Sequence, residues 1–87
     1  MISLKVIVHE DITSDLIHRF RNFGEDVYRE LRDEVDINID QIDRSENEFE
    51  IHNIKNSQVN RVIKRIEYHV DKHGFDKSGE VIRIHFK

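Results

Sequence analysis

The fold depends on residues 35–52, which read VDINIDQIDRSENEFEIH. Val35, Ile37 and Ile39 alternate with polar residues, which is typical of a β-strand with one buried face. The alternation slips at Gln41, which is polar where the pattern requires an apolar residue, so we expect a β-bulge or the end of the strand there. The first half of the stretch therefore predicts a strand.

The second half of the stretch predicts a partner strand. Residues 44–47 (RSEN) favour a turn. After this turn, Phe49 and Ile51 lie on one face of the predicted strand. Glu50 and His52 lie on the opposite face. The two strands are therefore expected to form an antiparallel hairpin near the middle of the chain.

An amphipathic helix is predicted before the hairpin, ending at about Asp33. Thr13 can cap its first turn, and Ile12 can pack against Ile17 as a hydrophobic staple. Gly24 lies within the helix, where it either introduces a kink or divides the helix into two. The apolar stripe that faces the core consists of Leu16, Phe20, Phe23, Val27 and Leu31.

A second amphipathic helix is predicted after the hairpin. Asn56 or Ser57 is expected to cap its start. Gly74 suits a left-handed position just after the helix, and Phe75 would then contact Val70, as in a Schellman motif. The apolar stripe of this helix consists of Val59, Ile63, Ile66 and Val70.

The two ends of the chain complete the predicted sheet. Residues 2–9 form one strand, and residues 80–87 form another after a turn at residues 76–79. Their core faces consist of Ile2, Leu4, Val6 and Val8 in the first strand and Ile82, Ile84 and Phe86 in the last. The order β-α-β-β-α-β predicts an α+β fold, a two-layer ferredoxin-like sandwich with a four-stranded antiparallel sheet and both helices on one face. We expect residues 1–87 to form a single domain.

The composition of the 87-residue chain excludes several classes of protein. Apolar residues make up 37% of the chain, which suits a thin two-layer core better than a multilayer enzyme. There is no cysteine, so disulfides and zinc–thiolate sites are excluded. No segment approaches the roughly 20 apolar residues of a membrane span, and Ser3 and Lys5 interrupt the short run Ile2–Val8, so no signal peptide is predicted. We therefore expect a soluble, cytoplasmic protein without a cofactor.

The face of the sheet that carries no helix is expected to be charged and to bind a protein partner. Residues 33–50 contain eight acidic residues and one basic residue, a net charge of −7 against −4 for the whole chain, so the hairpin dominates the charge balance. Three histidines on the face come from different strands and lack the short spacing of a metal site, so no metal site is predicted. The predicted partner-binding residues are Lys5, His9, His52, Arg83 and His85, with Asp36 and Asp40 on the acidic edge.

No catalytic site is predicted. The three glycines are isolated and form no phosphate-binding loop. Glu10 and Asp11 follow the first strand and could hold a magnesium ion, which makes a metal-dependent phosphodiesterase the weakest of three hypotheses. His69 and His73 share one helix face, but we expect them to interact with the helix dipole rather than to hold a metal.

Two stronger hypotheses remain. The first is a non-enzymatic interaction or regulatory module that docks another protein, or a second copy of itself, through the charge-segregated sheet face and the acidic hairpin. A face with one acidic and one basic edge is self-complementary under a two-fold axis, so a homodimer is consistent with this hypothesis. The alternative is a nucleic-acid-binding module that uses the second helix, because residues 55–72 carry five basic and two acidic residues, a net charge of +3. Its predicted contacts are Arg61, Lys64, Arg65 and Lys72.

Overall fold

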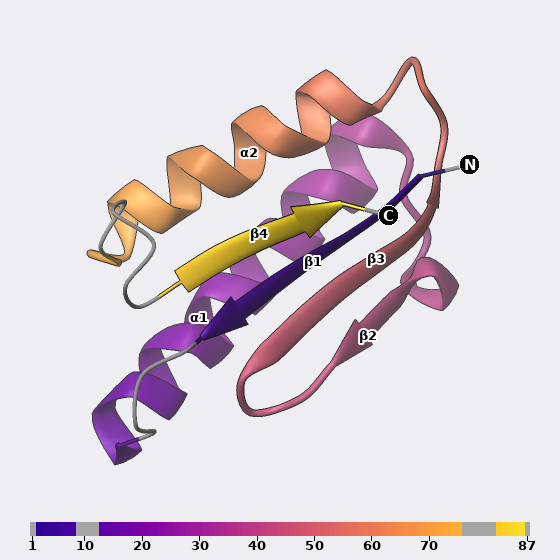
Figure 1. The fold of residues 1–87 in the computed structure, drawn as a ribbon. Helices are drawn as coiled ribbons and strands as arrows, with labels where there is room; N and C mark the ends of the chain where they lie inside the picture. Colours follow the sequence, from indigo (N-terminus) through magenta and orange to yellow (C-terminus); the bar gives the residue numbers. More distant parts are fainter. Residues whose placement is uncertain (1, 9–12, 76–81, 87) are drawn as a thin grey trace.

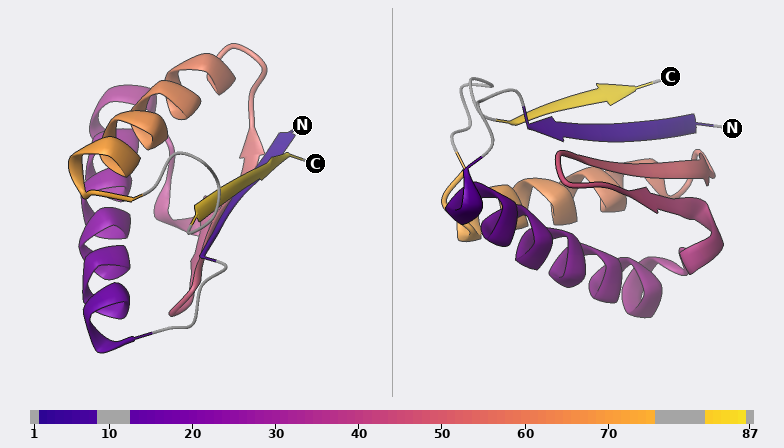
Figure 2. Two further views of the ribbon diagram at one scale, coloured as in Figure 1. Left: turned by 60° about the vertical axis from the view of Figure 1, so that its left-hand side comes forward. Right: turned by 90° about the horizontal axis from the view of Figure 1, so that it is seen from below.

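The computed structural model describes residues 2–8, 13–75 and 82–86, which form two helices packed on one side of an antiparallel sheet (Figures 1 and 2). The strands are β1 (Ile2–Val8), β2 (Ile42–Arg44), β3 (Glu48–Ile54) and β4 (Ile82–Phe86), and the helices are α1 (Ser14–Glu30) and α2 (Val59–Lys72). The prediction of an α+β fold with two helices and an antiparallel sheet is confirmed. Neither helix has both the length and the apolar character needed to cross a membrane, within the residues described.

Strand β1 lies next to β3 in the sheet, and the order of the strands is β2-β3-β1-β4. From Ser3 to Val8 in β1 and from Glu48 to His52 in β3, buried residues alternate with half-buried ones, so the predicted faces are confirmed over these residues. The backbone registers pair Lys5 with Glu50 of β3 and with His85 of β4. The predicted turn at residues 76–79 lies outside the described residues, as do His9, Glu10, Asp11 and Ile12.

The strand predicted at residues 35–40 is wrong. Helix α1 continues instead into one turn of π-helix, η1 (Leu31–Val35), and a short 3-10 helix, η2 (Ile39–Gln41), leads into β2. Val35 lies four residues after Leu31, so it continues the helical stripe as well as starting the alternating pattern. Asp36, with a φ of 62°, ends the helix in the left-handed conformation. Ile39, which the strand pattern placed in the core, is 63% exposed.

Helix α1 begins as predicted and passes through Gly24 without interruption. The side chain of Thr13 accepts a hydrogen bond from the backbone N–H of Leu16 at 3.1 Å. A Cβ atom at position 24 would lie 3.3 Å from Cδ2 of Phe49. Glycine therefore lets α1 approach β3 closely, and it does not divide the helix into two.

The start of α2 differs from the prediction because Gln58 takes the place assigned to a cap at Asn56 or Ser57. The side chain of Gln58 is buried, accepts a hydrogen bond from the backbone N–H of Lys55 at 3.1 Å and donates one to the carbonyl of Val35 at 2.9 Å. It thereby ties the start of α2 to the end of η1. The buried face of the helix is also rotated from the predicted stripe, and consists of Val62, Ile66, His69 and Val70, with Val59 and Ile63 half-buried.

The end of α2 is the predicted Schellman motif. The backbone N–H of Gly74 donates to the carbonyl of Asp71 at 3.1 Å, and that of Phe75 donates to the carbonyl of Val70 at 2.9 Å. Gly74 has a φ of 76°, a conformation that side chains with a Cβ atom rarely adopt.

We expect Gly74→Ala to lower the free energy of unfolding by about 1 kcal/mol, because alanine is strained at a positive φ. Urea denaturation followed by circular dichroism measures this loss. A gain in stability would contradict the prediction, because it would show that the backbone relaxes without strain.

Candidate functional site

Strands β1, β2 and β3 have one side that faces away from the helices, here called the open sheet face. This side carries a connected group of charged side chains. Lys5 Nζ lies 3.9 Å from carboxylate oxygens of both Glu48 and Glu50. His52 Nε2 contacts Asp43 Oδ2 at 2.6 Å and lies 3.8 Å from Glu50 Oε1. The predicted positions of Lys5 and His52 on this face are confirmed.

The acidic part of this face is formed by residues other than those predicted. Asp36 follows η1 and Asp40 lies in η2, so neither is on a strand, and their role in partner binding stays a prediction. Asp43 takes their place in the sheet, where it pairs in register with Glu50. Asp43 was missed because β2 begins at Ile42, seven residues after the start of the predicted strand at Val35.

The basic end of the predicted docking face is described only in part. The backbone register places Arg83 opposite Ile7 and His85 opposite Lys5. His9 lies outside the described residues. Among the described side chains, the positive charge of this face is therefore that of Lys5.

The basic residues of α2 are partly neutralised by acidic neighbours. Arg65 forms ion pairs with Glu30 at 3.7 Å and with Glu34 at 3.2 Å. Arg61 donates a hydrogen bond to the backbone carbonyl of Glu34 at 3.5 Å. Lys64 and Lys72, which complete the predicted nucleic-acid surface, are exposed. These pairings reduce the positive potential that phosphate binding requires.

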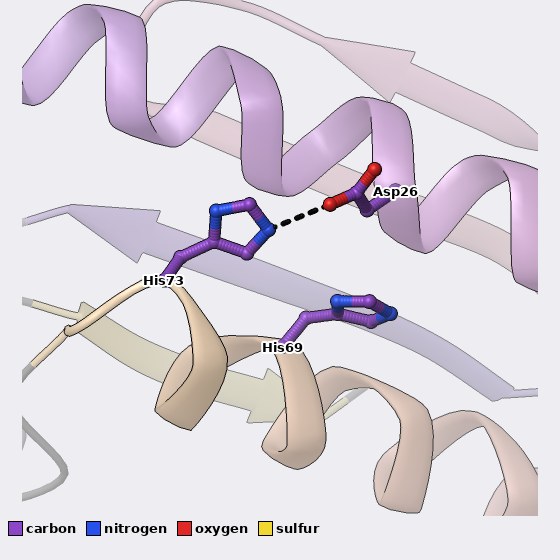
Figure 3. A group of neighbouring side chains, drawn as sticks. All are labelled: Asp26, His69 and His73. Atoms are coloured by element: carbon purple, nitrogen blue, oxygen red, sulfur yellow. Dashed lines mark hydrogen bonds and ion pairs between the residues drawn. The ribbon is translucent and has the colours of Figure 1, made fainter.

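A second group of polar side chains lies between α1 and α2, where the sequence predicted no site (Figure 3). His73 Nε2 contacts Asp26 Oδ2 at 2.8 Å, and His69 Nε2 lies 3.0 Å from Glu30 Oε2. Both histidines are near the end of α2, as predicted, but their rings contact carboxylates of α1 in addition to lying near the helix terminus. Asp26 and Glu30 are four residues apart, as are His69 and His73, so each pair occupies one face of its helix.

His69 is the most constrained member of this group. The residue is only 1% exposed. Neither of its ring nitrogens has a hydrogen-bond partner of good geometry among the described residues, and the same holds for Glu30 Oε2 despite its distance of 3.0 Å from His69 Nε2. A buried imidazole with unsatisfied nitrogens costs free energy unless another partner compensates for it.

The two groups differ in how far their hydrogen bonds are satisfied. Asp43, Glu50 and His52 bring ligand atoms within 4.8 Å of one another on the open sheet face, but His52 already has a short contact with Asp43. Asp26, His69 and His73, between the helices, also bring ligand atoms within 4.8 Å of one another. In this group both ring nitrogens of His69 lack a hydrogen bond. No protein-family model, curated protein or solved structure matches this chain.

Proposed function

We propose that this chain is a non-enzymatic docking module, built as a ferredoxin-like sandwich, that binds a second copy of itself through the open sheet face. The strand order β2-β3-β1-β4, with the first and third strands central, supports this architecture. Both helices pack on the opposite side of the sheet, which leaves this face available (Figure 2).

The observation that carries the proposal is a change of charge across the strands. One register row runs from Asp43 through Glu50 and Lys5 to the backbone position of His85. It begins with the carboxylates of Asp43 on β2 and Glu50 on β3 and reaches the amine of Lys5 on β1. A two-fold axis between two facing copies, parallel to the strands, places the acidic half of one copy against Lys5 of the other.

The strength of this docking should depend on salt. Exposed ion pairs are screened over about 8 Å at physiological ionic strength, so charge complementarity contributes mostly to orientation and association rate. Asp36 and Asp40 lie next to the acidic half in the sequence and add to the field that attracts a basic partner surface.

Reversing two charges on the acidic half is expected to weaken self-association. The side chains of Asp43 and Glu48 are 76% and 42% exposed, so Asp43→Lys with Glu48→Lys changes the surface with little effect on packing. We expect the dimer dissociation constant to rise at least about tenfold, a loss of about 1.4 kcal/mol, in sedimentation velocity at low salt.

Asp15→Lys with Glu67→Lys is the matched control, because it makes the same change of charge on the exposed sides of α1 and α2. This control should leave the dissociation constant within about twofold of that of the unmodified chain. The proposal is wrong if the unmodified chain is monomeric at all concentrations, or if both double variants weaken the dimer equally.

The same experiment separates docking from nucleic-acid binding. A labelled single-stranded oligonucleotide that co-sediments with the unmodified chain, but not with Arg61→Glu combined with Lys64→Glu, would favour the alternative function of α2. The proposed docking function expects no co-sedimentation at physiological salt, because Glu30 and Glu34 neutralise part of the basic surface.

A further inference from the structure

Four polar side chains face one another across the contact between α1 and α2. Asp26, His69 and His73 each offer a ligand atom, and these atoms all lie within 4.8 Å of one another. Ligand atoms of a tetrahedral zinc ion lie roughly 3.3 Å apart, since each is about 2.0–2.1 Å from the metal. The three atoms would therefore have to approach one another by at most about 1.5 Å to reach coordination distance.

The unsatisfied imidazole of His69 points to a ligand independently of this spacing. A buried polar ring without a hydrogen bond is rare in folded proteins. In Figure 3, Nδ1 of His69 lies on the side of the ring nearer to His73 and Asp26, and Nε2 points away from them. Nδ1 is therefore the nitrogen placed to bind an ion between the two helices.

Glu30 has the position of a carboxylate that orients a metal-binding histidine. Its Oε2 atom lies 3.0 Å from Nε2 of His69, the nitrogen not directed at Asp26 and His73. Histidines that bind metals usually donate their second N–H to a carboxylate or a carbonyl, which fixes the tautomer and the ring orientation. A slight turn of the ring on metal binding would satisfy both nitrogens of His69 and Oε2 of Glu30.

We propose that Asp26, His69 and His73 bind a divalent transition-metal ion, with zinc as the best-matched ion and Glu30 as the carboxylate that orients His69. Two imidazoles and one carboxylate suit zinc, cobalt or nickel, whereas magnesium and calcium prefer sites made of oxygen atoms alone. The side chain of Asp26 is 30% exposed, so water can reach the fourth coordination position. The ion would connect α1 to the end of α2.

Thermal unfolding of chelator-treated protein, with and without added metal, tests this site. Zinc at a free concentration one hundred times its dissociation constant should raise the midpoint temperature by about 10 °C or more. The same concentration of magnesium should not change it. Cobalt should bind with one ion per chain and give the visible absorption bands of a low-symmetry, nitrogen- and oxygen-coordinated ion.

Substitution of each ligand should remove this response. His73→Gln and Asp26→Asn keep the size of the side chain but lose a ligand, so zinc should no longer raise the midpoint temperature of either variant. His69→Leu is the second kind of test, because it removes the buried unsatisfied ring and should fold without metal yet show no metal response. Circular dichroism verifies that each variant is folded before metal is added.

His52→Gln is the matched control, because it removes the histidine of the exposed Asp43, Glu50 and His52 group and leaves the group between the helices unchanged. This variant should keep the full zinc response. The proposal is overturned if zinc does not stabilise the unmodified chain, if His73→Gln and His69→Leu keep the response, or if His52→Gln removes it.

Discussion

Replacing Phe23 by alanine is expected to lower the free energy of unfolding by about 3–5 kcal/mol. Phe23 is completely buried, and its ring stacks on Phe20 with a centroid distance of 5.5 Å. It also makes edge-to-face contacts with Phe75 at 5.6 Å and with Phe49 at 6.4 Å. This one side chain therefore joins α1 to β3 and to the end of α2, and its removal leaves a cavity at the centre of the core.

This loss is a large fraction of the total stability, because small domains are stabilised by only about 5–15 kcal/mol. Tyr68→Ala is the matched control, since Tyr68 is an aromatic residue of α2 that is 54% exposed, and its removal should change stability by about 0.5 kcal/mol or less. The measurement is the urea midpoint of both variants at constant slope. Equal midpoints would show that the core does not depend on Phe23.

Features that depend on neighbouring residues in the chain could be predicted from the sequence. The cap at Thr13 involves a partner three residues away, and the Schellman motif at Gly74 and Phe75 involves partners three and five residues away. Such motifs are specified by local conformational preference, so a single sequence contains the information that they need. The alternation of β1 and β3 was predicted for the same reason.

The strand predicted at residues 35–40 failed because two periodic patterns overlap there. Val35 belongs to the helical spacing that begins at Val27 and Leu31, and also to the alternation with Ile37. The buried side chain of Gln58 donates a hydrogen bond to the carbonyl of Val35, and this bond favours the helical conformation over the strand. That bond joins residues 23 positions apart, so the local pattern contains no sign of it.

The group between the helices was missed for a related reason. The spacing of His69 and His73 was recognised, but their partners Asp26 and Glu30 lie on another helix more than 38 residues earlier in the chain. Which faces of α1 and α2 meet depends on the rotation of each helix about its axis. The stripe predicted for α2 contains Ile63 but neither Val62 nor His69. His69 was therefore not expected to face α1.

The rotation of α2 can be tested directly, because it reverses the expected effects of two adjacent substitutions. Val62 is completely buried, whereas Ile63 is half-buried at the edge of the core. Val62→Asp should therefore lower the free energy of unfolding by at least about 4 kcal/mol, since it buries a carboxyl group without a partner. Ile63→Asp should cost about 1–2 kcal/mol, because its carboxyl group can reach water.

Valine, isoleucine and aspartate have similar helix propensities, so the difference between the two variants reports burial rather than helix formation. Urea denaturation of both variants, measured side by side, gives this difference as a shift in midpoint. If Ile63→Asp were the more destabilising change, the buried face of α2 would be the one predicted from the sequence, which contains Ile63 and not Val62. That orientation would also turn His69 away from Asp26 and Glu30, so the same pair of variants tests the helix rotation on which the proposed metal site depends.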